Sequence, residues 1–354
     1  MTLDELKKNI KQGMPLMKVD FTGLNFSGEV LDGAVFLNCN FDGCDFSKAS
    51  LERVVFTQCQ LNRAKWINAV LLQTSVIECQ MEEMIIEGKL EAATLCNSQM
   101  PKSQWQKVEL DKVTLTGCQL ANNQFNDCVF STSTLMECDI KGVGLDGCTF
   151  YNVAWTKADF TEVTIKQCEF NQVLLLESQF VDKNFDGLVF SRCTCAGSTF
   201  QRCSFQKADM LESNFSKCSL LECQFNEAQC QRGLFIDAEL DRCSFKQVGL
   251  EGANFQGAKV HHCSFEQANM TDAWLKSMYA DTTKFGESNL SGVSLFHASL
   301  NKCSFKKATL NRTLVHGLQE SGCDWSGTDK KQLLVTDPQQ EEIDEKLKAK
   351  GIAL

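Results

Sequence analysis

The chain is poor in several residues that most globular folds use freely: its 354 residues include 3 prolines, 2 tyrosines and 4 histidines. It also has no apolar run of about 18 or more residues, which excludes a helix long enough to span a bilayer. The first residues, MTLDELKKNIKQGMP, lack the charged, apolar and small-residue order of a signal peptide. We therefore expect a cytoplasmic protein with no membrane span.

The motifs of the common enzyme classes are absent as well. No phosphate-binding P-loop, dinucleotide fingerprint, nucleophile elbow or metalloprotease helix occurs. The histidines, His261, His262, His297 and His316, have no obvious nucleophile and base around them, and the repeat frame described below points all of them outward into solvent. We interpret the chain as non-enzymatic, and expect no catalytic residue, no cofactor and no metal site.

Basic patches are missing too. The formal net charge is −10, so the chain offers no footprint for direct nucleic-acid binding. Residues 16–180 carry 21 acidic and 12 basic residues, a net −9, whereas residues 181–326 carry 16 and 15, a net −1. The acidity lies in the first half, where a partner-facing role is possible.

Cysteine and phenylalanine are abundant, with 20 and 25 residues, and they recur with a period of five. Every fifth residue from Phe21 to Ile86 is apolar; after one omitted residue the series resumes at Leu90 and runs to Trp325, with Glu320 its only charged member. The residue two before each of these centres is small, and 17 of the 20 cysteines lie there. A period of five fits neither a helix nor a strand, so it indicates a chain that turns a corner every five residues.

Cysteine spacing gives the length of a full turn. Pairs 20 residues apart, such as Cys39 with Cys59, are commoner than any other spacing, which predicts four pentads per coil with like residues stacked on like. Parallel side chains in such a stack hold their Cβ atoms too far apart for disulfides, so we expect free thiols that act as small apolar core atoms. In this register His261 lies between Asp241 and Asp281. These three side chains could hold a metal ion weakly, but we favour the interpretation that His261 is a solvated surface residue.

Particular strings make the pattern specific: CDFSKASL (44–51), CSFQKADM (203–210), CSFEQANM (263–270) and CSFKKATL (303–310) resemble the pentapeptide-repeat family. The resemblance covers about residues 16–326. It implies an all-β fold, a right-handed quadrilateral β-helix, or solenoid, in which the centre and the small residue point inward. We expect a helical cap at 1–15, the solenoid at 16–326 and a C-terminal cap or dimerisation helix at 327–354. The irregular stretch 87–101 predicts either a bend or a tightened corner.

The two ends carry helix signals. Residues 2–12 predict a short helix with Thr2 as N-cap and Gly13 as its stop. Asp337 and Pro338 predict the start of a second helix that ends near Gly351. These helices would cover the open edges of the solenoid, and the second could instead join two copies.

One side of the predicted solenoid is apolar outside as well as inside. Its centres are Phe36, Phe56, Val76, Leu95 and every twentieth residue from there to Val315. The outward apolar neighbours, the candidate partner-binding stripe, are Val35, Leu37, Val55, Ile77, Met136, Leu174, Leu176, Leu234, Ile236, Trp274, Phe296 and Leu314. A long apolar stripe usually marks an interface, although sporadic surface apolarity is an alternative.

These patterns predict a protein-interaction scaffold or adaptor whose protein partner the sequence does not identify, with homodimerisation as an open possibility. Resemblance to cysteine- and phenylalanine-rich bacterial members suggests a type VI secretion accessory protein. Other family members suggest a DNA mimic that modulates DNA gyrase and protects it from quinolones, and a secreted effector is a third alternative. Mimicry is disfavoured because bases dilute the acids, as where Lys302, Lys306 and Arg312 lie close together.

Overall fold

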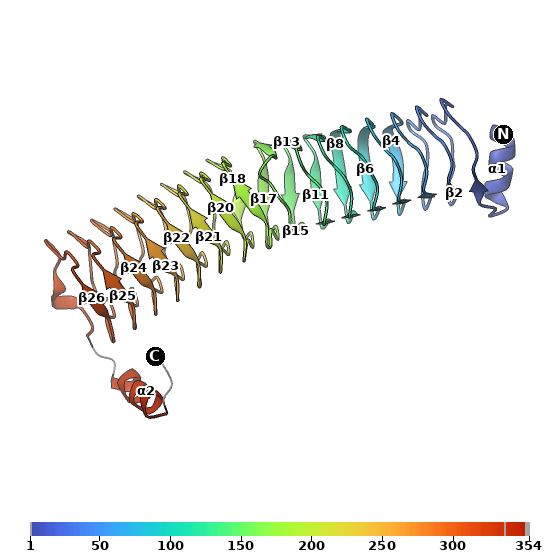
Figure 1. Cartoon of the computed structure of the whole chain (residues 1–354). Helices are drawn as coiled ribbons and strands as arrows, with labels where there is room; N and C mark the ends of the chain where they lie inside the picture. The colour runs from blue at the N-terminus through green and yellow to red at the C-terminus, as the bar shows by residue number, and fades with distance from the viewer. Residues whose placement is uncertain (1, 336–337, 351–354) are drawn as a thin grey trace. The chain divides into compact units, whose positions relative to one another are not determined.

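The computed structural model describes residues 2–335 and 338–350, and it divides into two compact units, residues 1–179 (unit 1) and 180–354 (unit 2). Each unit is built from stacked coils with short parallel strands, which confirms the predicted β-solenoid (Figure 1). The helices are α1 (Leu3–Lys11), the 3-10 helix η1 (Lys330–Gln332) and α2 (Pro338–Ala349). No helix in the described ranges is long and apolar enough to cross a membrane.

Helix α1 begins as the sequence predicts. The Glu5 backbone N–H donates to the Thr2 hydroxyl at 3.3 Å, and the Thr2 backbone N–H donates to the Glu5 carboxylate at 2.8 Å, which completes a capping box. Leu6 is buried, and Lys7 forms an ion pair with Glu29. The helix therefore lies against the first coils of unit 1. At the other end of the chain, the expected N-cap Asp337 and the expected stop near Gly351 lie outside the described residues.

Neighbouring coils pair residue i with residue i+20 in parallel register. Phe36 pairs with Phe56 in unit 1, and Leu220 pairs with Leu240 in unit 2. This confirms four pentads per coil. Because the register is a multiple of five, every inward centre lies on another centre, and every outward residue lies on the equivalent outward residue of the next coil.

The strands of unit 1 form two sheets. One face has the order β1-β2-β3-β5-β7-β9-β12-β15. Its strands are β1 (Leu16–Met17), β2 (Val35–Leu37), β3 (Val55–Thr57), β5 (Ser75–Ile77), β7 (Thr94–Cys96), β9 (Thr114–Thr116), β12 (Thr134–Met136) and β15 (Ala154–Thr156). The other sheet contains β4 (Lys65–Leu72), β6 (Ile85–Glu91), β8 (Gln104–Asp111), β10 (Gln124–Asn126), β11 (Val129–Ser131), β13 (Gly144–Asp146), β14 (Thr149–Tyr151), β16 (Thr164–Lys166) and β17 (Glu169–Asn171).

In unit 2 one face is a regular ladder and the others are held by isolated bridges. Strands β20 to β26 pair in succession along that face. The strands are β18 (Gln179–Val181), β19 (Phe190–Ser191), β20 (Thr199–Gln201), β21 (Ser219–Leu221), β22 (Glu239–Asp241), β23 (Lys259–His261), β24 (Tyr279–Asp281), β25 (Ser299–Asn301) and β26 (Gln319–Ser321). A bridge from Leu314 to Leu334 extends the pairing past residue 326, where the last pentad was expected to end.

Corner residues, two positions after each centre, have positive φ angles whether or not they are glycine, as at Arg53 (54°) and Glu212 (56°). A left-handed conformation costs a non-glycine residue about 1 kcal/mol. The side chains there are mostly long and polar, point to solvent and pair between coils: Arg192 Nε and Arg232 Nη1 each lie 3.1 Å from a carboxylate oxygen of Glu212. Exposed pairs of this kind add about 0–1 kcal/mol each, so corners are set by the register and not by their own side chains.

The residue missing from the pentad series is absorbed at one corner of unit 1. Strand β6 passes through this corner without a turn, and its pairing with β4 shifts at Glu87 and Gly88, which leaves Asn68 as a β-bulge. Gly88 has a φ of 102°, and a Cβ there would lie 3.1 Å from the Asn68 Cα, so only glycine fits without movement. On the next face the pairing continues with an offset of 19 residues, from Val76 to Leu95, so that each inward centre still pairs with an inward centre.

Stacked aromatic rings fill the core. In unit 2 the centres Phe185, Phe205, Phe225, Phe245, Phe265, Phe285, Phe305 and Trp325 form the predicted column, with successive ring centroids 4.0–5.2 Å apart and planes within 12° of parallel. Each stacked pair adds about 0.5–1.5 kcal/mol to the area it buries. The column therefore holds the coils of unit 2 to one another.

All 20 cysteines are free thiols, and they do more than fill space. The Cys44 thiol donates to the backbone carbonyl of Phe21 at 3.0 Å, and the Cys118 thiol donates to that of Leu95 at 3.3 Å, in each case 23 residues earlier. The Thr74 and Ser133 hydroxyls make the same contact to Leu51 and Leu110. The position two residues before a centre, here called the small site, can thus hold a short side chain that donates a hydrogen bond, a role that the packing argument from sequence did not include.

We expect Phe225→Ala to lower the free energy of unfolding by about 3–5 kcal/mol, because it removes a fully buried ring that stacks on Phe205 and Phe245. Urea denaturation followed by circular dichroism measures the change, and hydrogen exchange should place it within neighbouring coils. Trp274→Ala is the control, since Trp274 is 58% exposed and its removal should cost less than about 1 kcal/mol. Equal losses in the two variants would contradict the ring column as a source of stability.

The buried thiols predict a decline of stability in alkali. Burial raises the pKa of Cys44 to about 11 and those of Cys218 and Cys303 to about 12, from an ordinary value of 9.0. Because the folded pKa is the higher one, the stabilisation is fully present below pH 9 and is lost as the pH rises toward 12. Urea denaturation at a series of pH values should show a plateau and then this fall. In the Cys44→Ala, Cys218→Ala, Cys303→Ala triple variant the fall should be shallower, and an unchanged slope would refute the assignment.

Candidate functional site

The predicted stripe lies, in unit 1, on the outer side of the sheet β1 to β15. Met136 and Leu174 are each 41% exposed, and Leu37, Val55 and Ile77 are half-buried. We call the outward residues of this sheet, from β2 to the coil that follows β15, the neutral face. They are Val35, Leu37, Val55, Thr57, Ser75, Ile77, Thr94, Cys96, Thr114, Thr116, Thr134, Met136, Ala154, Thr156, Leu174 and Leu176. None of these residues is charged.

Other faces of unit 1 are different. Val129 on β11 and Tyr151 on β14 are 41% and 48% exposed, but charged residues lie around them. Val129 pairs with Glu109 in the preceding coil, and Glu169 continues the column in a later coil. Charge depletion, more than apolarity as such, distinguishes the core of an interface from the rest of a protein surface. The neutral face has this property over seven successive strands and the coil that follows them.

In unit 2 the stripe is interrupted. Leu234 pairs with Asn254, and Trp274, 58% exposed, pairs with Ser294. Ile236 is half-buried, and Lys276 places a charge in its column two coils later. The apolar residues return at Phe296 and Leu314. The stripe residues lie on the outside of the coils, and the structure separates a continuous neutral face in unit 1 from isolated apolar patches in unit 2; their role in binding a partner stays a prediction.

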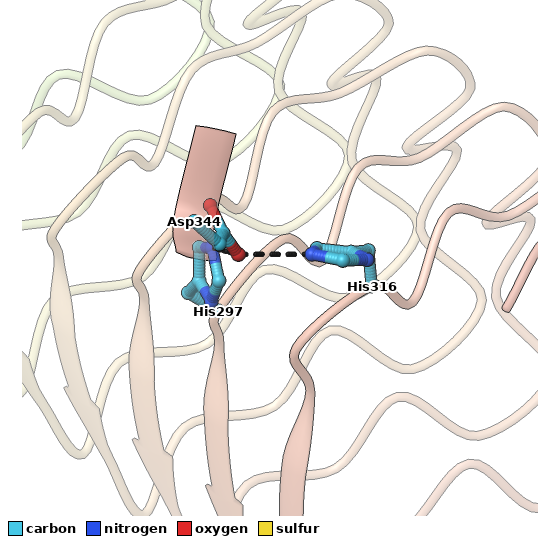
Figure 2. Close-up of side chains that lie close together, drawn as sticks. All are labelled: His297, His316 and Asp344. Atoms are coloured by element: carbon cyan, nitrogen blue, oxygen red, sulfur yellow. Dashed lines mark hydrogen bonds and ion pairs between the residues drawn. The ribbon is translucent and has the colours of Figure 1, made fainter. Parts of the chain in front are cut away.

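Two of the histidines are not solvated, contrary to the prediction. His261 and His262 are at the surface as expected, and His261 stacks in register between Asp241 and Asp281. His316, however, is only 8% exposed, and His297 is half-buried. Both lie outside the solenoid core, as the repeat frame requires, but Asp344 of helix α2 lies against them (Figure 2), and their side chains are only 13% and 11% exposed.

The two imidazoles meet Asp344 of α2. His316 Nε2 lies 2.9 Å from Asp344 Oδ2 in a hydrogen bond, and His297 Nε2 lies 2.9 Å from the same oxygen (Figure 2). The Asp344 side chain is only 7% exposed. Sequence reasoning missed this group because it involves a helix outside the repeat, whose docking position the pentad pattern does not specify.

Local geometry fixes both rings. The His297 backbone N–H donates to the His316 carbonyl at 3.0 Å, so the residues lie diagonally across adjacent coils. Their ring centroids are 5.5 Å apart at 80°, and Phe296, a stripe residue, packs against the His316 ring at 5.6 Å and 88°. Gly317 has no room for a side chain, since a Cβ there would lie 2.3 Å from His297 Nδ1. Glycine at this corner lets the His297 ring lie over it.

Comparison with known protein families agrees with the repeat fold described above. The family model described as a pentapeptide repeat region matches residues 108–185 and 198–265, and the model for pentapeptide repeats in eight copies matches residues 16–53 and 283–313. The chain belongs to the pentapeptide-repeat family. No curated protein matches this pentapeptide-repeat chain.

Solved pentapeptide-repeat structures are similar to it at low identity. A pentapeptide repeat protein from the Arabidopsis thaliana thylakoid lumen is 20% identical, over 28% of this chain and 67% of its own, with a TM-score of 0.24. QnrB1, a plasmid-mediated fluoroquinolone resistance protein, is 18% identical over 57% of this chain and 97% of its own, with a TM-score of 0.29. HetL, involved in heterocyst differentiation regulation in the cyanobacterium Nostoc sp. strain PCC 7120, is 15% identical over 95% and 98%, with a TM-score of 0.16.

Proposed function

We propose that this pentapeptide-repeat protein is a non-enzymatic scaffold that binds a protein partner through the neutral face of unit 1. The observation that carries the proposal is that no outward side chain of the neutral face, from Val35 to Leu176, is charged. Val, Ile, Leu, Met and Thr side chains on a rigid parallel sheet form a flat surface that loses little conformational entropy on contact.

The same chemistry defines the partner. A charged side chain buried against the neutral face would find no counter-charge there, and an unpaired buried charge is costly. The bound surface must therefore also be apolar and uncharged at its centre. Charged corner residues such as Lys18, Glu137 and Lys157 border the face, so complementary charges on the partner belong at the rim.

DNA mimicry toward gyrase, the alternative from the family resemblance, needs acidic side chains in rows without counter-charges. The corner column of unit 2 weighs against it, because acids alternate with bases: Asp182 Oδ1 lies 2.6 Å from Arg202 Nε, and Glu222 Oε1 lies 3.0 Å from Arg242 Nε. A supercoiling assay with and without a quinolone tests it. The type VI setting, the effector role, the cytoplasmic location and dimerisation through α2 stay predictions.

The test of the scaffold function inserts charge into the neutral face. We expect Met136→Glu with Leu174→Glu to weaken partner binding by about 100-fold or more, because both carboxylates would be buried without counter-charges. The partner is first captured from native lysate, identified and purified, and its affinity is then measured by calorimetry. Light scattering of the scaffold alone reports whether a second copy of the chain is the partner.

Val129→Glu with Tyr151→Glu is the matched control. It adds the same charge at apolar residues of similar exposure, on a face of unit 1 that already carries charges, and it should leave the affinity unchanged. If both double variants bind as the wild type does, or if both lose binding equally while their circular dichroism is unaltered, the neutral face is not the binding surface.

A further inference from the structure

The group under α2 combines the donor atoms of a metal site. His297 and His316 each offer an imidazole nitrogen and Asp344 offers a carboxylate oxygen, and these atoms all lie within 4.8 Å of one another. Among residues 2–335 and 338–350, this is the only group of three or more potential ligands so close together. We propose that His297, His316 and Asp344 bind a Zn²⁺ ion that fastens helix α2 to the last coils of unit 2.

The contacts without an ion leave one nitrogen unsatisfied. His316 Nε2 is hydrogen-bonded to Asp344 Oδ2, but His297 Nε2 is buried and makes no hydrogen bond, although it lies 2.9 Å from the same oxygen. A buried polar atom in that state is unfavourable, because it has lost its hydrogen bonds to water. A cation placed between the three residues accepts a lone pair from each nitrogen and compensates the charge of Asp344, so one ion satisfies all three ligands.

Two of the three distances between ligand atoms are close to those that zinc requires. Zinc lies about 2.0–2.2 Å from nitrogen and oxygen ligands, so two ligand atoms of a tetrahedral ion are about 3.4 Å apart. Each Nε2 now lies 2.9 Å from Oδ2, and an outward movement of about half an ångström in each pair would admit the ion. Such a movement is within the reach of side-chain rotation.

The ligand types select the metal. Imidazole nitrogens suit zinc, copper, iron and nickel, whereas calcium and magnesium prefer a full set of oxygen ligands. The described thiols do not lie within this group. Three protein ligands leave one position of a tetrahedral ion for water.

The solenoid holds its two ligands ready. The backbone hydrogen bond from His297 to the His316 carbonyl, the Phe296 ring against His316 and the missing side chain at Gly317 together fix both imidazoles in adjacent coils. The third ligand comes from α2. An ion bound here therefore connects a rigid surface to a separate helix, and its binding energy is added to the docking of that helix.

Calorimetric titration of ZnCl₂ into the full-length, chelator-treated and reduced protein tests the site. We expect one ion per chain, with an affinity that falls by about 100-fold or more in His316→Gln and in Asp344→Asn. The matched control is His262→Gln, which removes an exposed imidazole 3.5 Å from Asp241 and should leave zinc binding unchanged. Gly317→Ala keeps all three ligands but displaces the His297 ring, so it should also weaken binding.

Two further measurements distinguish zinc binding at this site from zinc binding to cysteine thiols. They also distinguish the loss of a zinc ligand from a general structural effect of the substitution. Zinc should slow hydrogen exchange in α2 of the wild type and not in His316→Gln, and bound Co²⁺ should show d–d bands without thiolate charge-transfer bands. The proposal is overturned if zinc does not bind, if His316→Gln and Asp344→Asn bind it as tightly as the wild type, or if the cobalt spectrum carries thiolate bands. The zinc site joins α2 to the last coils of unit 2, and its test does not depend on the neutral face of unit 1.

Discussion

The fold depends on the parallel backbone ladder that joins each coil to the one 20 residues later. Strand pairings such as Phe36 with Phe56 and Leu220 with Leu240 fix the register, and the register then places every side chain on its own equivalent. Rings stack on rings and corner charges lie beside corner charges. No coil could bury its apolar centres alone, so each coil is stable only through its neighbours.

Within that ladder the small site carries two duties. It must be narrow, because it lies beside a large centre, and where it holds cysteine, serine or threonine it can donate to a carbonyl of the preceding coil. Cysteine meets both requirements, as do serine and threonine at Ser133 and Thr74. The cysteines are free thiols that fill this narrow position and add a hydrogen bond to it, so no disulfide is needed to explain their number.

Much of this could be predicted because the repeat is local. The spacing of the cysteines predicted the coil length, Thr2 predicted the N-terminal cap, and the pentad frame predicted the outward direction of each stripe residue. The thiol donors were missed, although Ser and Thr at equivalent positions such as Ser133 were a visible signal. The shielding of His297 and His316 was missed because a frame defines direction and not what lies beyond it. Their 19-residue spacing, one short of a coil, was an unused signal that the two histidines are diagonal neighbours, but nothing in the repeat placed Asp344 above them.

The inward and outward positions of the pentad divide the chain into two nearly independent sets. The centre and the small residue determine folding, whereas the three outward residues meet solvent or each other across a fixed spacing. Substitutions in the outward set can therefore exchange a charged column for a neutral one without repacking the interior. Unit 1 illustrates the result, with the neutral face and the face around Val129 built on the same coils. Recognition in such a protein can change at the pace of surface mutation while the scaffold beneath it remains constant.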